Sequence, residues 1–268
     1  MPAPDWSLLL RSPAFETTAL LLGLVVGSFA NVCIHRLPRR ESVVSPCSRC
    51  PACGTLILAR DNVPVVGWLL LRGRCRACRA PISWRYPVVE ATNGLLWLAL
   101  AGLHGPRAQT FVAMALVTAL LVLGVIDLDH QILPDAITLP GIAGGLAASF
   151  LPGSGVRPLA AAVAAAGGWL AFAAVAKAYE RTRGIEGLGQ GDWKMAAMLG
   201  AFLGWQGMLL AVLLASVAGT VVGLGVVALR GRDLRHALPF GTFLGAGGIA
   251  VVFLGDKVLA WYRGLLGG

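Results

Sequence analysis

The sequence has few charged residues for its length: of 268 residues only 13% are Asp, Glu, Lys or Arg, while 57% are hydrophobic. A soluble domain of this length needs far more polar surface, because a folded protein cannot hide that much apolar area. The sequence also lacks a basic start followed by a short apolar core and a small-residue cleavage site, so we interpret its first apolar segment as a retained helix. It shows no internal repeat and no low-complexity tail. These absences indicate an integral membrane protein.

The apolar residues come in long runs, and a run of about 18 or more predicts a membrane helix. We count eight such segments. The sixth and seventh are separated only by Trp205, Gln206 and Gly207, so seven spans is the competing count. The fold class that we predict is therefore an all-α polytopic membrane protein with about eight transmembrane helices. The segments cover residues 17–34, 87–103, 109–126, 133–151, 158–178, 194–206, 208–229 and 239–262.

Positive charge is distributed unevenly along the chain. Ten arginines lie in residues 35–86, and further basic residues lie in 177–194 and 230–238. If each span crosses once, all three regions fall on one side, and the positive-inside rule makes that side cytoplasmic, with both termini on the outer side. The other side keeps Arg11, Arg107, Arg157, Lys257 and Arg263. We interpret the arginines as facing anionic lipid of the bilayer; nothing resembles a nucleic-acid recognition module, so no nucleic-acid partner is expected.

Four of the six cysteines form two pairs, Cys50-x2-Cys53 and Cys75-x2-Cys78. Each pair can place two thiolates on one side of a tight turn, and two such turns complete a tetrahedron around zinc. The 35–86 loop has little apolar content of its own, so a metal would supply folding free energy. A redox dithiol or structural disulfides are the alternatives, although a reducing cytoplasm disfavours disulfides. Arg79 follows the second pair where Gly54 follows the first, which predicts a less ideal second turn.

Acidic residues are scarce, with 13 in all, and several lie at the boundaries of apolar segments, where a charge is costly unless it has a role. Asp127 ends the third segment and Asp192 begins the sixth, which places both at the cytoplasmic edge of the bilayer on different helices. Two carboxyl groups a few ångströms apart cannot both ionise, so one can serve as acid and the other as base. The alternatives are a helix N-cap for Asp192 and an interfacial charge for Asp127. Asp129 and Asp135 remain open as substitutes.

Several further motifs occur in a definite order. The chain contains Gly27-Ser28-Phe29-Ala30-Asn31-Val32-Cys33-Ile34-His35-Arg36-Leu37-Pro38, then the cysteine loop with Asp61-Asn62-Val63-Pro64, then Arg85-Tyr86-Pro87-Val88-Val89-Glu90, the Asp127-to-Asp135 stretch and Gly189-Gln190-Gly191-Asp192. In this order they resemble the bacterial type IV prepilin peptidases (leader peptidase/N-methyltransferase), intramembrane aspartic peptidases of the GxGD type. The resemblance covers about residues 23–200.

The resemblance implies the following activity and sites. The enzyme cuts the basic leader from type IV prepilins or secretion pseudopilins at the cytoplasmic face of the bacterial inner membrane. Its family catalytic aspartates match Asp127 and Asp192. Gly189 and Gly191 have no side chain, so we expect the backbone there to pass close to the partner helix or to an extended substrate. The four zinc cysteines match Cys50, Cys53, Cys75 and Cys78. Members commonly also methylate the new N-terminal residue with S-adenosylmethionine.

The sequence has no Rossmann-like methyltransferase motif. Asn31, Arg36 and Glu90 are polar groups near the cytoplasmic interface that we consider for the methyl-donor site, with structural hydrogen bonding as their alternative role. The competing functions are a peptidase without methyltransferase activity, a multi-span transporter with a zinc docking loop, and a membrane scaffold. We expect residues 1–34 to form the N-terminal segment and first helix, 35–86 the cytoplasmic zinc module, and 87–268 the transmembrane peptidase core.

Overall fold

The computed structural model describes residues 13–184, 189–230 and 238–266. Arg11, Arg232 and Arg235, which contribute to the orientation argument, lie outside the described residues, as do the outermost residues of both termini. The described part is helical, and its only β-pairing consists of two isolated bridges. It divides into two compact units at Thr118, inside helix α5 (Ala108–His130). The predicted all-α fold is confirmed.

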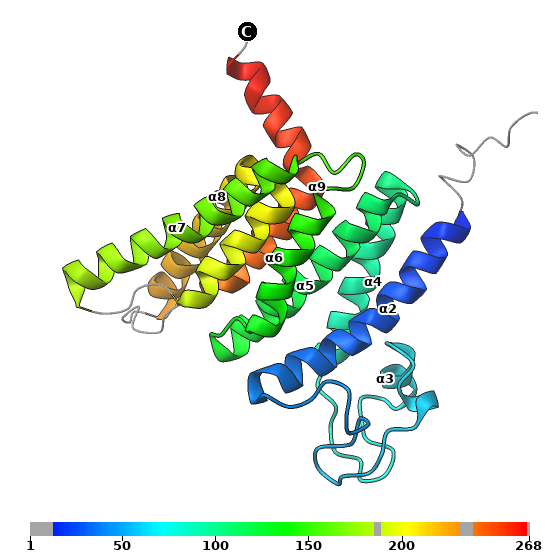
Figure 1. Cartoon of the computed structure of the whole chain (residues 1–268). Helices are drawn as coiled ribbons and strands as arrows, with labels where there is room; N and C mark the ends of the chain where they lie inside the picture. The colour runs from blue at the N-terminus through cyan, green and yellow to red at the C-terminus, as the bar shows by residue number, and fades with distance from the viewer. Residues whose placement is uncertain (1–12, 185–188, 231–237, 267–268) are drawn as a thin grey trace, which may run out of the picture. The chain divides into compact units, whose positions relative to one another are not determined.

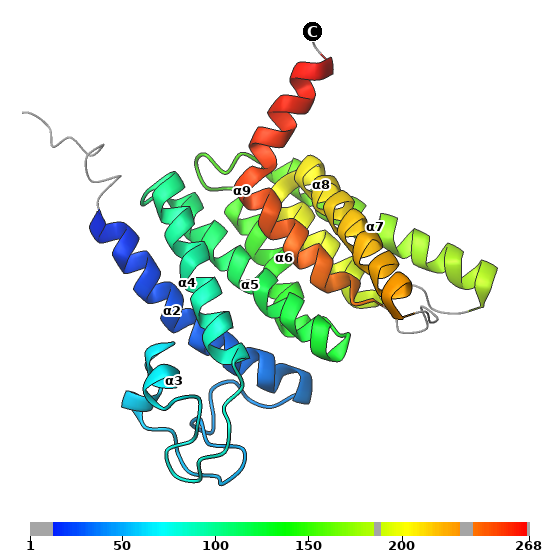
Figure 2. The same cartoon turned by 180° about the vertical axis from the view of Figure 1, so that it is seen from behind.

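The first unit contains helices α2 (Pro13–Arg36), α3 (Val66–Leu70) and α4 (Arg85–His104), together with the short 3-10 helices η1 (Leu37–Arg39) and η2 (Ala59–Asp61). Helices α2 and α4 lie side by side (Figures 1 and 2). Glycines permit their close approach: a Cβ at Gly23 would lie 2.9 Å from the Cα of Gly94, and one at Gly27 would lie 2.8 Å from the Cα of Glu90. Small residues of this kind let apolar helices pack closely where no water drives them together.

Buried polar side chains reinforce this unit. The Asn93 side-chain amide donates to the Gly23 carbonyl at 2.7 Å, and its oxygen accepts the Thr118 hydroxyl at 2.8 Å. The Trp97 indole N–H donates to the same hydroxyl at 3.0 Å. Each polar group therefore has a partner inside an apolar environment, where an unpaired one would cost several kcal/mol. These bonds fix the register of α2, α4 and the first half of α5.

The second unit contains the rest of α5 with α6 (Asp135–Ala148), α7 (Pro158–Arg183), α8 (Gln190–Arg230) and α9 (Phe240–Leu266). Helix α8 is broken at Gly204, whose φ of 66° and ψ of −179° are not helical. Its two arms run in opposite directions (Figures 1 and 2). The predicted boundary between the sixth and seventh segments thus falls at Gly204, two residues before the centre of the Trp205–Gly207 separator.

Close glycine contacts also hold the second unit together. A Cβ at Gly200 in α8 would lie 2.5 Å from the carbonyl oxygen of Ala164 in α7. A Cβ at Gly247 in α9 would lie 2.6 Å from the carbonyl oxygen of Ala211 in α8. These approaches place backbone against backbone, which larger residues would prevent.

By length and composition, five of the described helices could cross a membrane: α2, α5, α7, α8 and α9. The predicted segment 87–103 corresponds to α4, which includes Glu90 and Asn93 among its apolar residues and is not one of the five. The predicted segment 133–151 corresponds to α6, whose 14 residues make a short apolar helix. The chain is therefore a multi-pass membrane protein with five long apolar helices.

Candidate active site and metal centre

Asp127 lies in the last turn of α5 and is only 5% exposed. One of its carboxylate oxygens accepts the backbone N–H of Thr242 at 2.8 Å and lies 3.3 Å from the Thr242 hydroxyl. That hydroxyl also donates to the carbonyl of Gly124 at 2.8 Å. The first N–H groups of a helix have no partner within the helix, so an acceptor at the start of α9 satisfies one of them. The start of α9 thereby fixes the orientation of the Asp127 carboxylate.

Asp192 lies in the first turn of α8 and is half-buried. Its carboxylate accepts a backbone hydrogen bond from Gly189 and lies within electrostatic range of Asp127. Helix α8 begins at Gln190, so Asp192 is inside the helix and the N-cap interpretation is wrong. The structure therefore brings together the two carboxyl groups that the resemblance selected, from helices α5 and α8.

Leu133 fills the space beside this pair and leaves no room for side chains at two glycines. A Cβ at Gly191 would lie 2.8 Å from the Cβ of Leu133. A Cβ at Gly241 would lie 2.9 Å from the Leu133 Cδ1 and 3.0 Å from the Asp127 Cγ. Gly189 differs, because a Cβ there would lie at an ordinary 3.5 Å from a carboxylate oxygen of Asp192. The glycines of the Gly-x-Gly-Asp motif thus have unequal steric requirements.

Two further acids of this region are Asp129 and Asp135. Asp129 is exposed at the end of α5. Asp135 is the first residue of α6 and forms an ion pair with Lys194 of α8, with 2.6 Å between Nζ and Oδ1. Pro134 occupies the N-cap position of α6, so Asp135 lies inside the helix. Of these acids, Asp127 is the one that lies against Asp192.

Sequence reasoning missed Leu133, Gly241 and Thr242. The only sequence signal was Gly241-Thr242 at the start of the last apolar segment, since a Thr in the first turn of a helix has an amide available for an acceptor. That signal does not identify Asp127 as the acceptor, because Asp127 precedes Thr242 by 115 positions.

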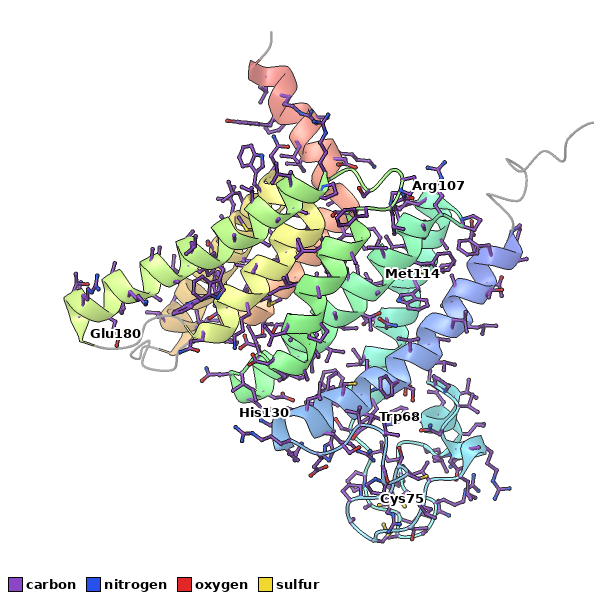
Figure 3. All side chains as sticks on the ribbon, in the orientation of Figure 1. Trp68, Cys75, Arg107, Met114, His130 and Glu180 are labelled. Carbon is purple, nitrogen blue, oxygen red and sulfur yellow. The ribbon has the colours of Figure 1, made fainter. Side chains whose placement is uncertain are left out.

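The four paired cysteines converge in the 35–86 loop, as predicted. Their sulfur atoms all lie within 4.8 Å of one another, with 3.8 Å between Cys50 and Cys78 and 4.0 Å between Cys53 and Cys75. A tetrahedral ion with Zn–S bonds of about 2.3 Å needs sulfur–sulfur separations of about 3.8 Å. The cluster therefore has the ligand number, ligand type and spacing of a metal site (Figure 3 labels Cys75).

The two cysteine pairs form equivalent turns. The Gly54 N–H donates to the Cys50 carbonyl at 2.8 Å, and the Arg79 N–H donates to the Cys75 carbonyl at 3.0 Å. Gly54 has a φ of 71° and Arg79 a φ of 61°. The second turn is thus formed in full, and the expected departure from ideal geometry appears as a left-handed backbone at Arg79, which a non-glycine residue adopts at a cost.

Hydrogen bonds around the cluster favour a thiolate at Cys53 and at Cys75. Those with the hydroxyl and backbone of Thr55 lower the pKa of Cys53 to about 6. Backbone hydrogen bonds from Cys78 and Ala77 lower the pKa of Cys75. At Cys78 a backbone hydrogen bond with Ala80 lowers the pKa, but the side-chain hydrogen bond with Cys53 and burial outweigh it and raise the pKa to about 11. Thiolates are the form that binds metal. Cys47 is exposed and outside the four-cysteine group, and Cys33 is half-buried in α2.

The three polar residues considered for the methyl donor share one cavity. Asn31, Arg36 and Glu90 line a space of about 570 Å³ in the first unit, together with residues of the cysteine loop. Asn31 donates from its side-chain amide to the Tyr86 carbonyl at 3.0 Å. Their convergence on one cavity was not predictable from their separate positions in the sequence.

These features define a class: a multi-pass membrane protein with two carboxyl groups on neighbouring helix ends and a cluster of four cysteines with the spacing of a metal site. Residues 21–103 match the family described as "Bacterial Peptidase A24 N-terminal domain", and residues 114–224 match the "Type IV leader peptidase family". The chain belongs to the type IV leader peptidase family.

Its relatives cover most of the chain. It is 42% identical over 263 residues to the "Prepilin leader peptidase/N-methyltransferase" of Burkholderia pseudomallei (strain K96243), covering 88% of this chain and 84% of that protein. It is 39% identical over 285 residues to the protein of that name from Pseudomonas putida, covering 98% of this chain and 99% of the relative. The Aeromonas hydrophila protein of that name is 39% identical over 272 residues, covering 92% of this chain and 93% of the relative. No solved structure matches the chain.

Proposed function

We propose that this protein cleaves the leader from type IV prepilins or pseudopilins at the cytoplasmic face of the bacterial inner membrane and then methylates the new N-terminus. The family membership and the printed names of the relatives support this activity. The observation that carries the peptidase part is the approach of Asp127 and Asp192 from two different helices, with Asp127 buried.

In the proposed reaction the two carboxyl groups hold a water molecule between them. Asp127, which accepts the Thr242 amide, serves as the base, because hydrogen bonds to a carboxylate favour its charged form. It removes a proton from the water, whose oxygen attacks the scissile carbonyl. Asp192 in its protonated form serves as the acid and donates its proton to the departing amine as the peptide C–N bond breaks. Gly189 and Gly191 lie beside the extended substrate in this proposal.

The topology that goes with this activity has eight crossings. Helices α2, α4, α5, α6, α7 and α9 supply six, and the two arms of α8 supply two. Eight crossings place the 35–86 loop, the end of α5 and the start of α8 on the cytoplasmic side, and both termini on the outer side. A peptide bond at the boundary between a basic leader and an apolar helix then reaches the depth of Asp127 and Asp192.

The four-cysteine cluster has a structural role in the proposed enzyme. Cys50, Cys53, Cys75 and Cys78 hold one structural zinc ion, which joins the two cysteine turns of a loop with little apolar core. Residues 1–34 form the N-terminal segment and first helix, 35–86 the zinc module, and 87–268 the peptidase core. S-adenosylmethionine supplies an activated methyl group for the amine that cleavage releases.

The test uses the purified full chain in detergent with a prepilin, with and without S-adenosylmethionine, followed by intact-mass analysis. We expect loss of the leader mass in both reactions and a gain of one methyl group only with the donor. Asp127→Asn and Asp192→Asn should each abolish cleavage, whereas Asp129→Asn, at an exposed position on the same helix end as Asp127, should retain it. Full cleavage by Asp192→Asn would contradict the proposal, and cleavage without methylation would reduce it to a peptidase.

A further inference from the structure

The cavity of about 570 Å³ in the first unit has the dimensions of a small-molecule site, for which about 300–1,000 Å³ is usual. Its wall is formed by the C-terminal half of α2, the start of α4 and the cysteine loop. Trp68, labelled with Cys75 in Figure 3, belongs to the loop side of this wall. Most of the lining surface is apolar. The charged side chains in the lining are Arg36, Arg49, Asp61, Arg76 and Glu90, and Asp61 and Arg76 form an ion pair with each other. An apolar wall with a few converging polar groups is usual in sites that hold small organic ligands.

Glu90 supplies a buried carboxylate to the cavity. Glu90 is only 7% exposed. Its Oε2 accepts the backbone N–H of Val65 at 2.7 Å. The Ser28 hydroxyl is a further hydrogen-bond donor to this carboxylate. Both donors are neutral, and a carboxylate oxygen pair can accept about four hydrogen bonds. A buried carboxylate with neutral partners and remaining acceptor capacity favours a cationic ligand.

The loop beside Glu90 is held in a strained conformation. Val65 has a φ of 61° and a ψ of −51°, and the Val66 N–H donates to the Pro64 carbonyl at 2.6 Å, which closes a three-residue turn. This turn is rare, and it is particularly unfavourable for a β-branched residue. The turn directs the Val65 amide to Glu90 and is followed by Trp68 of the cavity wall. Strained backbone that its surroundings enforce is concentrated at binding sites.

Arg36 supplies the opposite charge. Its guanidinium donates from Nη1 to the Ser42 carbonyl at 2.9 Å and from Nη2 to the Pro46 carbonyl at 2.7 Å. A guanidinium has five N–H donors, so these two bonds hold its orientation and leave donors for a carboxylate ligand. The cavity thus presents an anchored cation and a buried anion within one space, together with the aromatic rings of Tyr86 and Trp68.

We propose that this cavity is the binding site of the sulfonium methyl donor. S-adenosylmethionine carries a carboxylate, two cationic centres and a flat aromatic base. Arg36 binds the carboxylate, Glu90 faces the cationic end, and Tyr86 and Trp68 contact the base. This assignment rests on the methyltransferase part of the proposed function, and it places donor binding wholly within residues 28–90 of the first unit.

Photolabelling of the unmodified full chain tests the assignment without relying on the folding of a variant. Purified protein is irradiated with radiolabelled S-adenosylmethionine, digested, and the labelled peptides are sequenced. We expect label within residues 28–36, 61–68 or 82–90, and its loss when excess S-adenosylhomocysteine is added. Specific label confined to residues 119–266 would overturn the site.

Two variants with matched controls test the charged groups by equilibrium dialysis. Glu90→Gln keeps an acceptor for the Val65 amide but removes the charge, and Arg36→Gln removes the guanidinium. Each should weaken binding of S-adenosylmethionine by at least about tenfold, as expected for the loss of a charge-assisted contact. Glu41→Gln and Arg60→Gln, at exposed positions outside the cavity lining, should bind as the parent does. Thermal unfolding without donor verifies that each variant is folded.

The outcomes separate this site from the proposed function. Unchanged binding by both folded variants overturns the site, as does a parent protein that methylates cleaved pilin while its label lies outside the cavity. A parent protein that neither binds the donor nor methylates cleaved pilin overturns the site and the methyltransferase part of the proposed function together, while leader cleavage reports on the peptidase part separately.

Discussion

The Asp127 carboxylate and the Thr242 backbone N–H are 2.8 Å apart, although 115 positions separate the two residues in the sequence. This bond joins the last turn of α5 to the first turn of α9. The adjacent Gly241 has no Cβ, which is what allows the backbone of α9 to reach the carboxylate. The orientation of one proposed catalytic acid therefore depends on the last helix of the chain.

The hydroxyl of Thr242 provides the first prediction. Thr242→Val keeps the shape of the side chain and the amide bond to Asp127 but removes the hydroxyl that donates to the Gly124 carbonyl. We expect kcat/KM for leader cleavage to fall by about tenfold, because the start of α9 loses its bond to α5 and the Asp127 carboxylate loses the hydroxyl 3.3 Å from its oxygen. Thr220→Val removes a hydroxyl that bonds only within its own helix, to the Ser216 carbonyl, and should cleave normally. Equal rates for the two variants would contradict the positioning role.

The two glycines of the Gly-x-Gly-Asp motif differ in the room around them for an added side chain, and this difference gives a second prediction. Gly191→Ala should lose most leader cleavage, since the added Cβ would lie 2.8 Å from the Cβ of Leu133 and must displace the start of α8. Gly189→Ala meets only an ordinary 3.5 Å contact and should keep substantial activity. Gly225→Ala is the control for adding a methyl group to α8, because the new Cβ has no neighbour within 4 Å beyond the backbone of its own helix. Rates measured on one prepilin decide the order, and greater damage from Gly189→Ala would reverse the interpretation.

The left-handed backbone of Arg79 provides a third prediction. Arg79→Gly should stabilise the cysteine loop by about 1 kcal/mol, because a glycine adopts a φ of 61° without the steric cost that an L side chain incurs. The measurement is the chelator concentration that extracts half of the metal, which should rise. Arg60→Gly removes the same side chain from a 3-10 helix, where glycine has no such advantage, and should lower that concentration or leave it unchanged. A lower value for Arg79→Gly would show that its side chain outweighs its backbone strain.

Metal content provides a fourth prediction. Elemental analysis of the purified chain should find one zinc ion, and Cys75→Ser should remove it, because the sulfur atoms of the other three cysteines leave the tetrahedron incomplete. Cys47→Ser, outside the cluster, should keep the ion. Chelation should produce the same loss in the parent protein. A parent protein without metal whose loop is nevertheless ordered would show that hydrogen bonds alone hold the two cysteine turns.

The helices and the cysteine cluster were predictable because each has a local signal. A run of apolar residues identifies a membrane helix wherever it packs, and each Cys-x2-Cys pair specifies its own turn before the two pairs meet. The break in α8 was visible as the short polar separator Trp205-Gln206-Gly207, although the non-helical residue is Gly204.

The rest depends on contacts between distant parts of the chain. Spacing could not choose Asp127 over Asp129 or Asp135, and only the family resemblance did so before the structure showed which one is buried beside Asp192. The ion pair between Asp135 and Lys194 had no signal in the sequence, because a charged residue near the start of a helix is ordinary and does not identify its partner. The strained turn at Val65 was also unpredictable, since the Glu90 carboxylate that accepts the Val65 N–H lies on another helix.

The reversal at Gly204 has a consequence for membrane insertion. The first arm of α8, residues 190–203, is about 21 Å long at 1.5 Å per residue, which is shorter than the hydrocarbon layer of about 30 Å. At this length the first arm does not span the hydrocarbon layer by itself. No loop separates it from the second arm, so no connecting segment carries charges that could orient it. In the eight-crossing topology proposed above, we expect the two arms to enter the bilayer as one hairpin, so that Asp192 reaches its final depth only after the second arm has been synthesised.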